Sequence, residues 1–146
     1  MLQIFRGKKN ELSRSELLLL LLSLFERSAR NEVSLGEIHE AIRNAEDRVI
    51  SRFAFFQTIL YSPQVMDSLG ELSGSGLIRV YTYRHDAFLP KTFVAITPVG
   101  RSRSKELSER APPQLCLSLQ QAVETAIHSF HRTWVLWGRP SRSGTA

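Results

Sequence analysis

His128 and His131 are the closest approach to a metal site in this sequence. They are three residues apart, so on a helix both side chains would share one face, as metal ligands sometimes do. A third ligand would have to be Cys116 or the distant Glu124, and neither stands at a recognised ligand spacing. We therefore interpret the two residues as a satisfied or surface histidine pair and predict no metal site.

Nucleophilic chemistry has equally little support. No serine lies in a Gly-x-Ser-x-Gly turn, and there is no glycine-rich phosphate loop. Cys116 lies between two leucines, which is typical of a buried apolar residue rather than of a nucleophile. As the only cysteine, it also excludes an intrachain disulfide framework. We predict that the protein is not an enzyme and needs no cofactor.

Basic residues interleaved with tyrosines favour contact with a phosphate backbone. Tyr81 and Tyr83 belong to an expected β-hairpin, and four basic or potentially basic residues lie on or beside it: Arg79, Arg84, His85 and Lys91. A hairpin of this kind can lie along the backbone of double-stranded DNA. The alternative is a solvated hairpin whose tyrosines pack across the strands. Both interpretations remain open.

Four further arginines are candidates for phosphate contact. Arg101 and Arg103 open an expected helix, where a positive charge opposes the helix dipole and indicates an anionic neighbour, either phosphate or an acidic helix. Arg48 and Arg52 precede another expected helix. They would either contact phosphate or pair with the acidic residues at 46 and 47.

The helix expected at 62–75 is a poor reader of bases. It carries Asp67 and Glu71 but no Lys or Arg, although guanine is read mainly by Arg or Lys. Gln64 and Ser68 are the side chains that would touch base edges, and both also fit ordinary solvated positions.

The charge of the chain is concentrated at its ends. The sequence has 19 Lys and Arg against 14 Asp and Glu, which gives a formal net charge of +5. Residues 1–16 have four basic and two acidic residues, and 101–146 have seven and three, whereas 17–100 have eight and nine. This distribution permits DNA binding through the hairpin and the ends of the chain.

The 146 residues suit a single domain, and 42% of them are hydrophobic, which is typical of a globular protein. Six consecutive leucines, 17–22, are too few for a membrane span, which needs about 20 apolar residues. A signal peptide is disfavoured because Glu11 and Glu16 interrupt the preceding basic segment. We predict a buried helix here and a cytoplasmic protein without a membrane partner.

Capping and hydrophobic patterns predict a mostly helical α+β chain. Helices are expected from Ser13 to about Arg30, from Ser34 over a short stretch, and at 62–75, 97–110 and 118–138. Strands are expected at 77–84 and 92–96. Residues 48–61 fit either a helix or a strand, and in both cases should be largely buried.

This order resembles the winged helix-turn-helix superfamily. The residues that carry the likeness are Leu69–Ile78, with the glycines of Gly74-Ser75-Gly76, and Ile96-Thr97-Pro98-Val99-Gly100-Arg101. They are similar to the exits from the recognition helix and from the wing in bacterial regulators of the MarR and PadR type. The resemblance implies a winged-helix domain at 13–110, after a basic segment at 1–12.

In such regulators the C-terminal helix usually dimerises. The corresponding segment is 111–138, followed by a tail at 139–146 that we expect to be disordered. Its aromatic and aliphatic stripe would form a homodimer interface: Val123, Ile127, Phe130, Trp134 and Trp137.

One feature departs from the pattern. About fifteen residues, 47–61, separate the second and third helices, where a plain helix-turn-helix has a few. A similar segment is seen in winged-helix proteins linked to phage and defence loci, some of which are antitoxins or adaptor subunits. Two hypotheses follow: a dimeric DNA-binding transcriptional regulator, or a protein-interaction module within a larger assembly.

Overall fold

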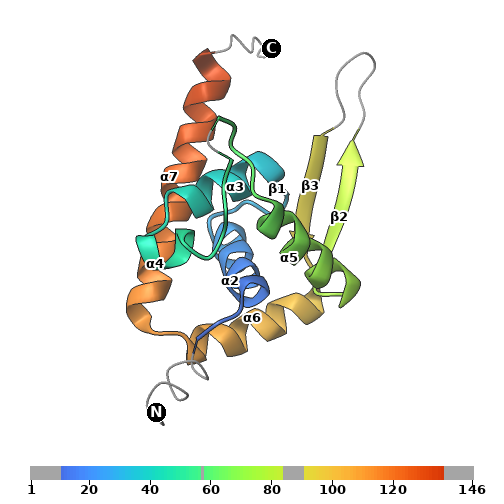
Figure 1. Cartoon of the computed structure of the whole chain (residues 1–146). Coiled ribbons are helices and arrows are strands. Elements are labelled where there is room, and N and C mark those ends of the chain that lie inside the picture. Colours follow the sequence, from blue (N-terminus) through green and yellow to red (C-terminus); the bar gives the residue numbers. More distant parts are fainter. Residues whose placement is uncertain (1–10, 57, 84–90, 137–146) are drawn as a thin grey trace.

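The computed structural model describes residues 11–56, 58–83 and 91–136. Its central element is helix α2, Arg14–Arg27, which contacts α5, α6, α7 and the sheet (Figure 1). The leucine run is buried all around this helix, as expected for a helix at the centre of a core. The predicted capping box of Ser13 and Glu16 is confirmed. The helix ends three residues before the expected Arg30, and Ala29 then adopts a positive φ of 67°.

A two-residue strand and a short helix follow. Strand β1, Val33–Ser34, was not predicted, because two residues are too few to show alternation. Helix α3, Leu35–Arg43, begins at a second capping box, in which the Ser34 hydroxyl accepts from the Glu37 N–H. The short second helix expected from Ser34 is therefore confirmed.

The segment between α3 and α5 is neither a long helix nor a strand. It contains only the single-turn helix α4, Asp47–Ile50, and the described residues of 51–62 form no helix or strand. Val49 and Phe53 are buried, but Phe56 is 50% exposed and Ile59 is 56% exposed. The expectation that this segment is largely buried is therefore wrong beyond Phe53.

Helix α5, Pro63–Gly74, leads into the hairpin. The Ser62 hydroxyl caps its first turn, as predicted, and Gly76, with φ of 77°, lets the chain reverse. Strands β2, Ile78–Tyr83, and β3, Lys91–Ile96, pair antiparallel, with Tyr81 opposite Phe93. The sheet order is β1-β3-β2, so β2 is an outer strand.

Two helices complete the described chain. Helix α6, Pro98–Arg110, is capped by the Thr97 hydroxyl as predicted. Helix α7, Pro113–Leu136, begins five residues before the expected Ser118, because proline is tolerated in a first helical turn. The predicted order of helices, a β-hairpin and then C-terminal helices is confirmed as a mostly helical α+β fold. The hairpin forms a small antiparallel sheet together with β1, which was not predicted.

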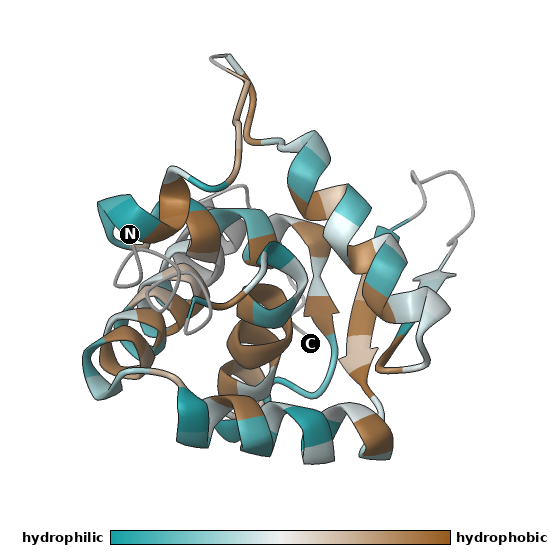
Figure 2. Cartoon of the chain, turned by 60° about the horizontal axis from the view of Figure 1, so that its bottom comes forward, coloured by the Kyte–Doolittle hydropathy of each residue, from teal (hydrophilic) through white to brown (hydrophobic). Residues whose placement is uncertain are grey.

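The hydropathy of the residues agrees with their positions in the fold. Figure 2 shows apolar residues concentrated on α2 in the middle, and mostly hydrophilic residues on α6 at the periphery. In the part of the chain that the structure describes, no helix combines the length and the apolar character needed to cross a membrane.

Candidate nucleic-acid interface

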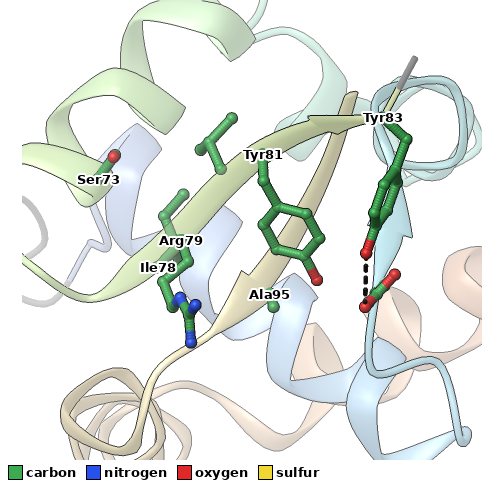
Figure 3. Close-up of a pocket in the computed structure, with 8 residues that line it drawn as sticks. Ser73, Ile78, Arg79, Tyr81, Tyr83 and Ala95 are labelled. Atoms are coloured by element: carbon green, nitrogen blue, oxygen red, sulfur yellow. Dashed lines mark hydrogen bonds between the residues drawn. The ribbon is translucent and has the colours of Figure 1, made fainter. Parts of the chain in front are cut away.

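The face of the hairpin that carries the tyrosines is the most distinctive surface feature. An open groove of about 650 Å³ runs along β2 (Figure 3). Six of its lining residues are Glu32, Ser73, Arg79, Tyr81, Tyr83 and Ala95. Alternation along the strand sends the side chains of Arg79, Tyr81 and Tyr83 to the same face of the sheet.

The aromatic rings of this face contact one another. The ring centroids of Tyr81 and Tyr83 are 5.5 Å apart, and so are those of Tyr83 and Phe93, both in edge-on geometry. The tyrosines therefore pack on each other and across the strands, as one of the two interpretations of the hairpin anticipated. This packing leaves Tyr83 44% exposed.

Glu32 adds a negative charge to the groove. The Tyr83 hydroxyl donates to its carboxylate at 3.4 Å (Figure 3). Desolvation and the Glu32 carboxylate raise the pKa of Tyr81 to about 12. Sequence reasoning missed Glu32, because nothing in the sequence pairs a residue before β1 with tyrosines some fifty positions later.

The hairpin candidates fall into two groups along the strands. Arg79 lies near the start of β2 and is exposed, and no described residue forms an ion pair with it. Lys91 is exposed at the start of β3, at the other end of the hairpin. Arg84 and His85 lie outside the described residues.

Helix α5 presents acidic rather than basic side chains. Asp67 and Glu71 are exposed. Ser68 is only 4% exposed, which leaves no surface for a base edge, and we therefore remove it from the interface. The Gln64 side-chain oxygen accepts from the Ala54 N–H at 3.2 Å, so this residue holds the preceding segment.

Arg52 also has an intramolecular role. Its Nη1 donates to the Leu12 carbonyl at 2.7 Å, which ties the segment before α5 to the start of α2. Arg52 lines a groove of about 330 Å³ together with Gln64, Asp67 and Glu71. The structure thus brings the predicted residues Arg52 and Gln64 together, but beside the carboxylates of Asp67 and Glu71.

The arginines at the start of α6 pair with α2. Arg101 donates through Nε to both oxygens of Glu26 at 2.9 Å, and this hydrogen bond raises its pKa. Arg103 pairs with Glu16 at 3.0 Å, and Arg48 pairs with Glu46 at 3.1 Å. Among the described residues, the anionic neighbours of Arg101 and Arg103 therefore include carboxylates of α2, not those of the acidic helix α5. Exposed pairs of this kind contribute little stability, so they do not preclude contact with phosphate.

The first residues of the expected dimerisation stripe pack inside the chain's own core. Val123 is fully buried and Ile127 is partly buried against the core, because α7 packs on α3 and α2. This corrects the assignment of Val123 to a dimer interface. The side chains of Phe130 and Trp134, and the whole of Trp137, lie outside the described part of the structure.

Nothing in the described residues assembles a metal site, since no three His, Cys, Asp or Glu side chains come together there. His128 is exposed, and the side chain of His131 is outside the described part. Cys116 is partly buried against the core rather than fully buried, and this desolvation raises the pKa of its thiol.

The structure defines a mostly helical α+β protein with an acidic helix α5 and a tyrosine-lined hairpin. No protein-family model, no curated protein and no solved structure matches this chain.

Proposed function

We propose that this chain is a winged-helix DNA-binding protein, a transcriptional regulator, that contacts phosphates through the outer end of its hairpin. The order of elements supports this proposal: helices, a glycine turn, a hairpin and then a capped helix. The hairpin is the wing, and it is anchored by β1 and by the junction with α6.

The observation that carries the proposal is the separation of charge. The outer end of the hairpin has Arg84, His85 and Lys91 in sequence, whereas α5 has two exposed carboxylates. The two carboxylates of α5 would be repelled by a phosphate backbone. Contact through the wing therefore gives binding that depends on salt and only weakly on base sequence.

Fluorescence anisotropy of labelled duplexes over a salt series tests this proposal. Replacing Arg84 and Lys91 together by alanine should weaken binding about tenfold or more and reduce the slope of log K against log salt by about 2. Lys105→Ala is the control for the loss of an exposed positive charge elsewhere: it removes one charge, against two in the test variant, from α6, at the opposite end of the molecule (Figure 1). Absence of binding to any duplex at low salt would contradict the proposal.

The acidic α5 and the exposed Phe56 and Ile59 favour a second candidate, a protein-interaction module such as an antitoxin or an adaptor subunit. In that case a basic protein partner binds α5. A partner recovered with the wild-type chain should be lost with Asp67→Lys/Glu71→Lys and kept with Glu109→Lys, a reversal on exposed α6. Under the DNA-binding proposal, the same double reversal tightens duplex binding.

A further inference from the structure

One face of the β-sheet is open to solvent and carries a row of aromatic rings. Directly opposite residues of paired strands share a face, and the register of β2 and β3 places six side chains on this one: Arg79, Tyr81, Tyr83, Lys91, Phe93 and Ala95. The other face is turned to the core, because the alternate residues Ile78, Val94 and Ile96 are buried. The open face therefore has a basic residue at each end and aromatic rings between them.

The rings leave surface on which a base can stack. Tyr81 and Tyr83 project from β2 into the groove of about 650 Å³ (Figure 3). Their interplanar angle is 88°, so this pair does not cover the two faces of either ring, and Tyr83 is 44% exposed. Exposed aromatic rings on an antiparallel sheet are a surface on which single-strand binders stack about two or three bases.

The charges beside the rings are complementary to those of a nucleotide. Arg79 is exposed, and no described residue forms an ion pair with it, so its guanidinium is available to a phosphate. Glu32 directly precedes β1, and on this face the Tyr83 hydroxyl reaches its carboxylate at 3.4 Å. A carboxylate repels phosphate but accepts hydrogen bonds from base amino groups, such as N4 of cytosine. A strand with its phosphates toward Arg79 and its base edges toward Glu32 matches both charges.

We propose that this open face binds a short stretch of single-stranded nucleic acid, with bases stacked on Tyr81 and Tyr83 and a phosphate bound by Arg79. A base amino group then donates to Glu32. Only an unpaired strand offers base faces to such a surface, because in a duplex the faces are stacked on one another. This inference goes beyond the proposed function and does not depend on it, since the duplex contact lies at the outer end of the hairpin.

Replacement of one ring tests the stacking. Fluorescence anisotropy measures the binding of labelled strands of about ten nucleotides, oligo(dC) and its RNA counterpart oligo(C). Tyr83→Leu should weaken the binding about tenfold, because one stack is lost, whereas Tyr83→Phe keeps the ring and should weaken it less than about twofold. Phe56→Leu is the matched control, since it removes a ring of similar exposure, 50%, from another surface. It should leave the binding unchanged.

A salt series tests the phosphate contact. Arg79→Gln should reduce the slope of log K against log salt by about 0.7, the value for one phosphate of a single strand. Lys105→Gln removes one exposed positive charge from α6 and should leave the slope unchanged. Both variants keep the tyrosines, so they decide the question if a ring substitution unfolds the chain.

A comparison of oligo(dC) with oligo(dT) tests the role of Glu32. Cytosine carries the N4 amino group where thymine carries the O4 acceptor. The wild-type chain should therefore bind oligo(dC) about fivefold more tightly than oligo(dT), and Glu32→Ala should abolish this preference. Glu109→Ala, which removes an exposed carboxylate from α6, should keep it.

Four outcomes would overturn the proposal. The first is a wild-type chain that binds neither oligo(dC) nor oligo(C) at low salt. The second is a Tyr83→Leu variant that binds the single strand no more weakly than Phe56→Leu. The third is a Tyr83→Leu variant that loses duplex binding by the same factor, which would make this face part of the duplex contact. The fourth is equal binding of oligo(dC) and oligo(dT) by the wild-type chain, which would exclude the contact with Glu32.

Discussion

Gly100 lies against the main-chain oxygen of Leu77, so closely that a Cβ at residue 100 would stand 2.0 Å from that oxygen. The same oxygen accepts from the Thr97 N–H at 3.1 Å and from the Thr97 hydroxyl at 3.0 Å. The start of β2 and the first turn of α6 are therefore joined at one carbonyl. Only glycine at position 100 permits this approach.

Gly100→Ala should consequently destabilise the fold by about 1–3 kcal/mol, because the methyl group must displace backbone. Urea unfolding followed by circular dichroism measures this change. Gly70→Ala is the matched control, since a methyl group at residue 70 of α5 would have nothing within 4 Å, and it should gain up to about 1 kcal/mol from helix propensity. Equal effects of the two substitutions would refute the close approach.

Val123→Ala should lower the free energy of unfolding by about 1–3 kcal/mol without changing association. Val123 is fully buried between helices of one chain, so the substitution leaves a cavity in that chain's own core. Val99→Ala removes the same atoms from a side chain that is 62% exposed, and should change stability by less than about 0.5 kcal/mol. Thermal unfolding together with sedimentation separates the two effects, and loss of a dimer with Val123→Ala would return this residue to the interface.

Local signals predicted the element boundaries well where a cap identifies them. Ser13, Ser34, Ser62 and Thr97 all accept the expected hydrogen bond from the first helical turn, because capping depends on neighbours within three residues. The conformation of residues 51–62 could not be predicted from such local signals. Its ring contacts, such as Tyr61 stacked on the buried His39 at 5.5 Å, join residues far apart in sequence.

The candidate site was less predictable than the fold. The sequence indicated basic residues, but it could not say that Arg101 finds Glu26, 75 positions away, or that Ser68 turns inward on α5. Amphipathic periodicity predicts that a stripe of residues is buried, but it does not say whether the stripe packs on the chain's own core or on a second copy. For this reason Val123 was expected at a dimer interface and is instead part of the core.

Glu32→Gln should lower the pKa of Tyr81 from its value of about 12 toward the ordinary tyrosine value near 10. Desolvation, the larger cause, remains in this variant, so the shift should be partial. Titration of ring-labelled tyrosines by NMR measures it directly. Glu124→Gln, an exposed change on α7, should leave the Tyr81 pKa where it is, and no shift with Glu32→Gln would contradict the arrangement in Figure 3.

Glu16 should make stability depend on acid pH. Burial raises its pKa, but the hydrogen bond from the Ser13 N–H and the charges of Arg110 and Arg103 outweigh burial and leave the pKa below its usual value. A carboxyl whose folded-state pKa is lowered contributes stability above its unfolded-state pKa, near 4.3, and loses it as pH falls through the folded-state value.

Glu16→Gln keeps the geometry of the cap but removes the charge, so it should cost about 1 kcal/mol at pH 7. The difference from wild type should shrink as pH falls below about 4.3 and vanish once Glu16 is protonated in the folded chain. Urea unfolding at a series of pH values measures it. Glu106→Gln is the control, because Glu106 also pairs with Arg103 but its side chain is 67% exposed, and its effect should be smaller at every pH. A Glu16→Gln deficit that persists at low pH would show that Glu16 acts through the cap and not through its charge.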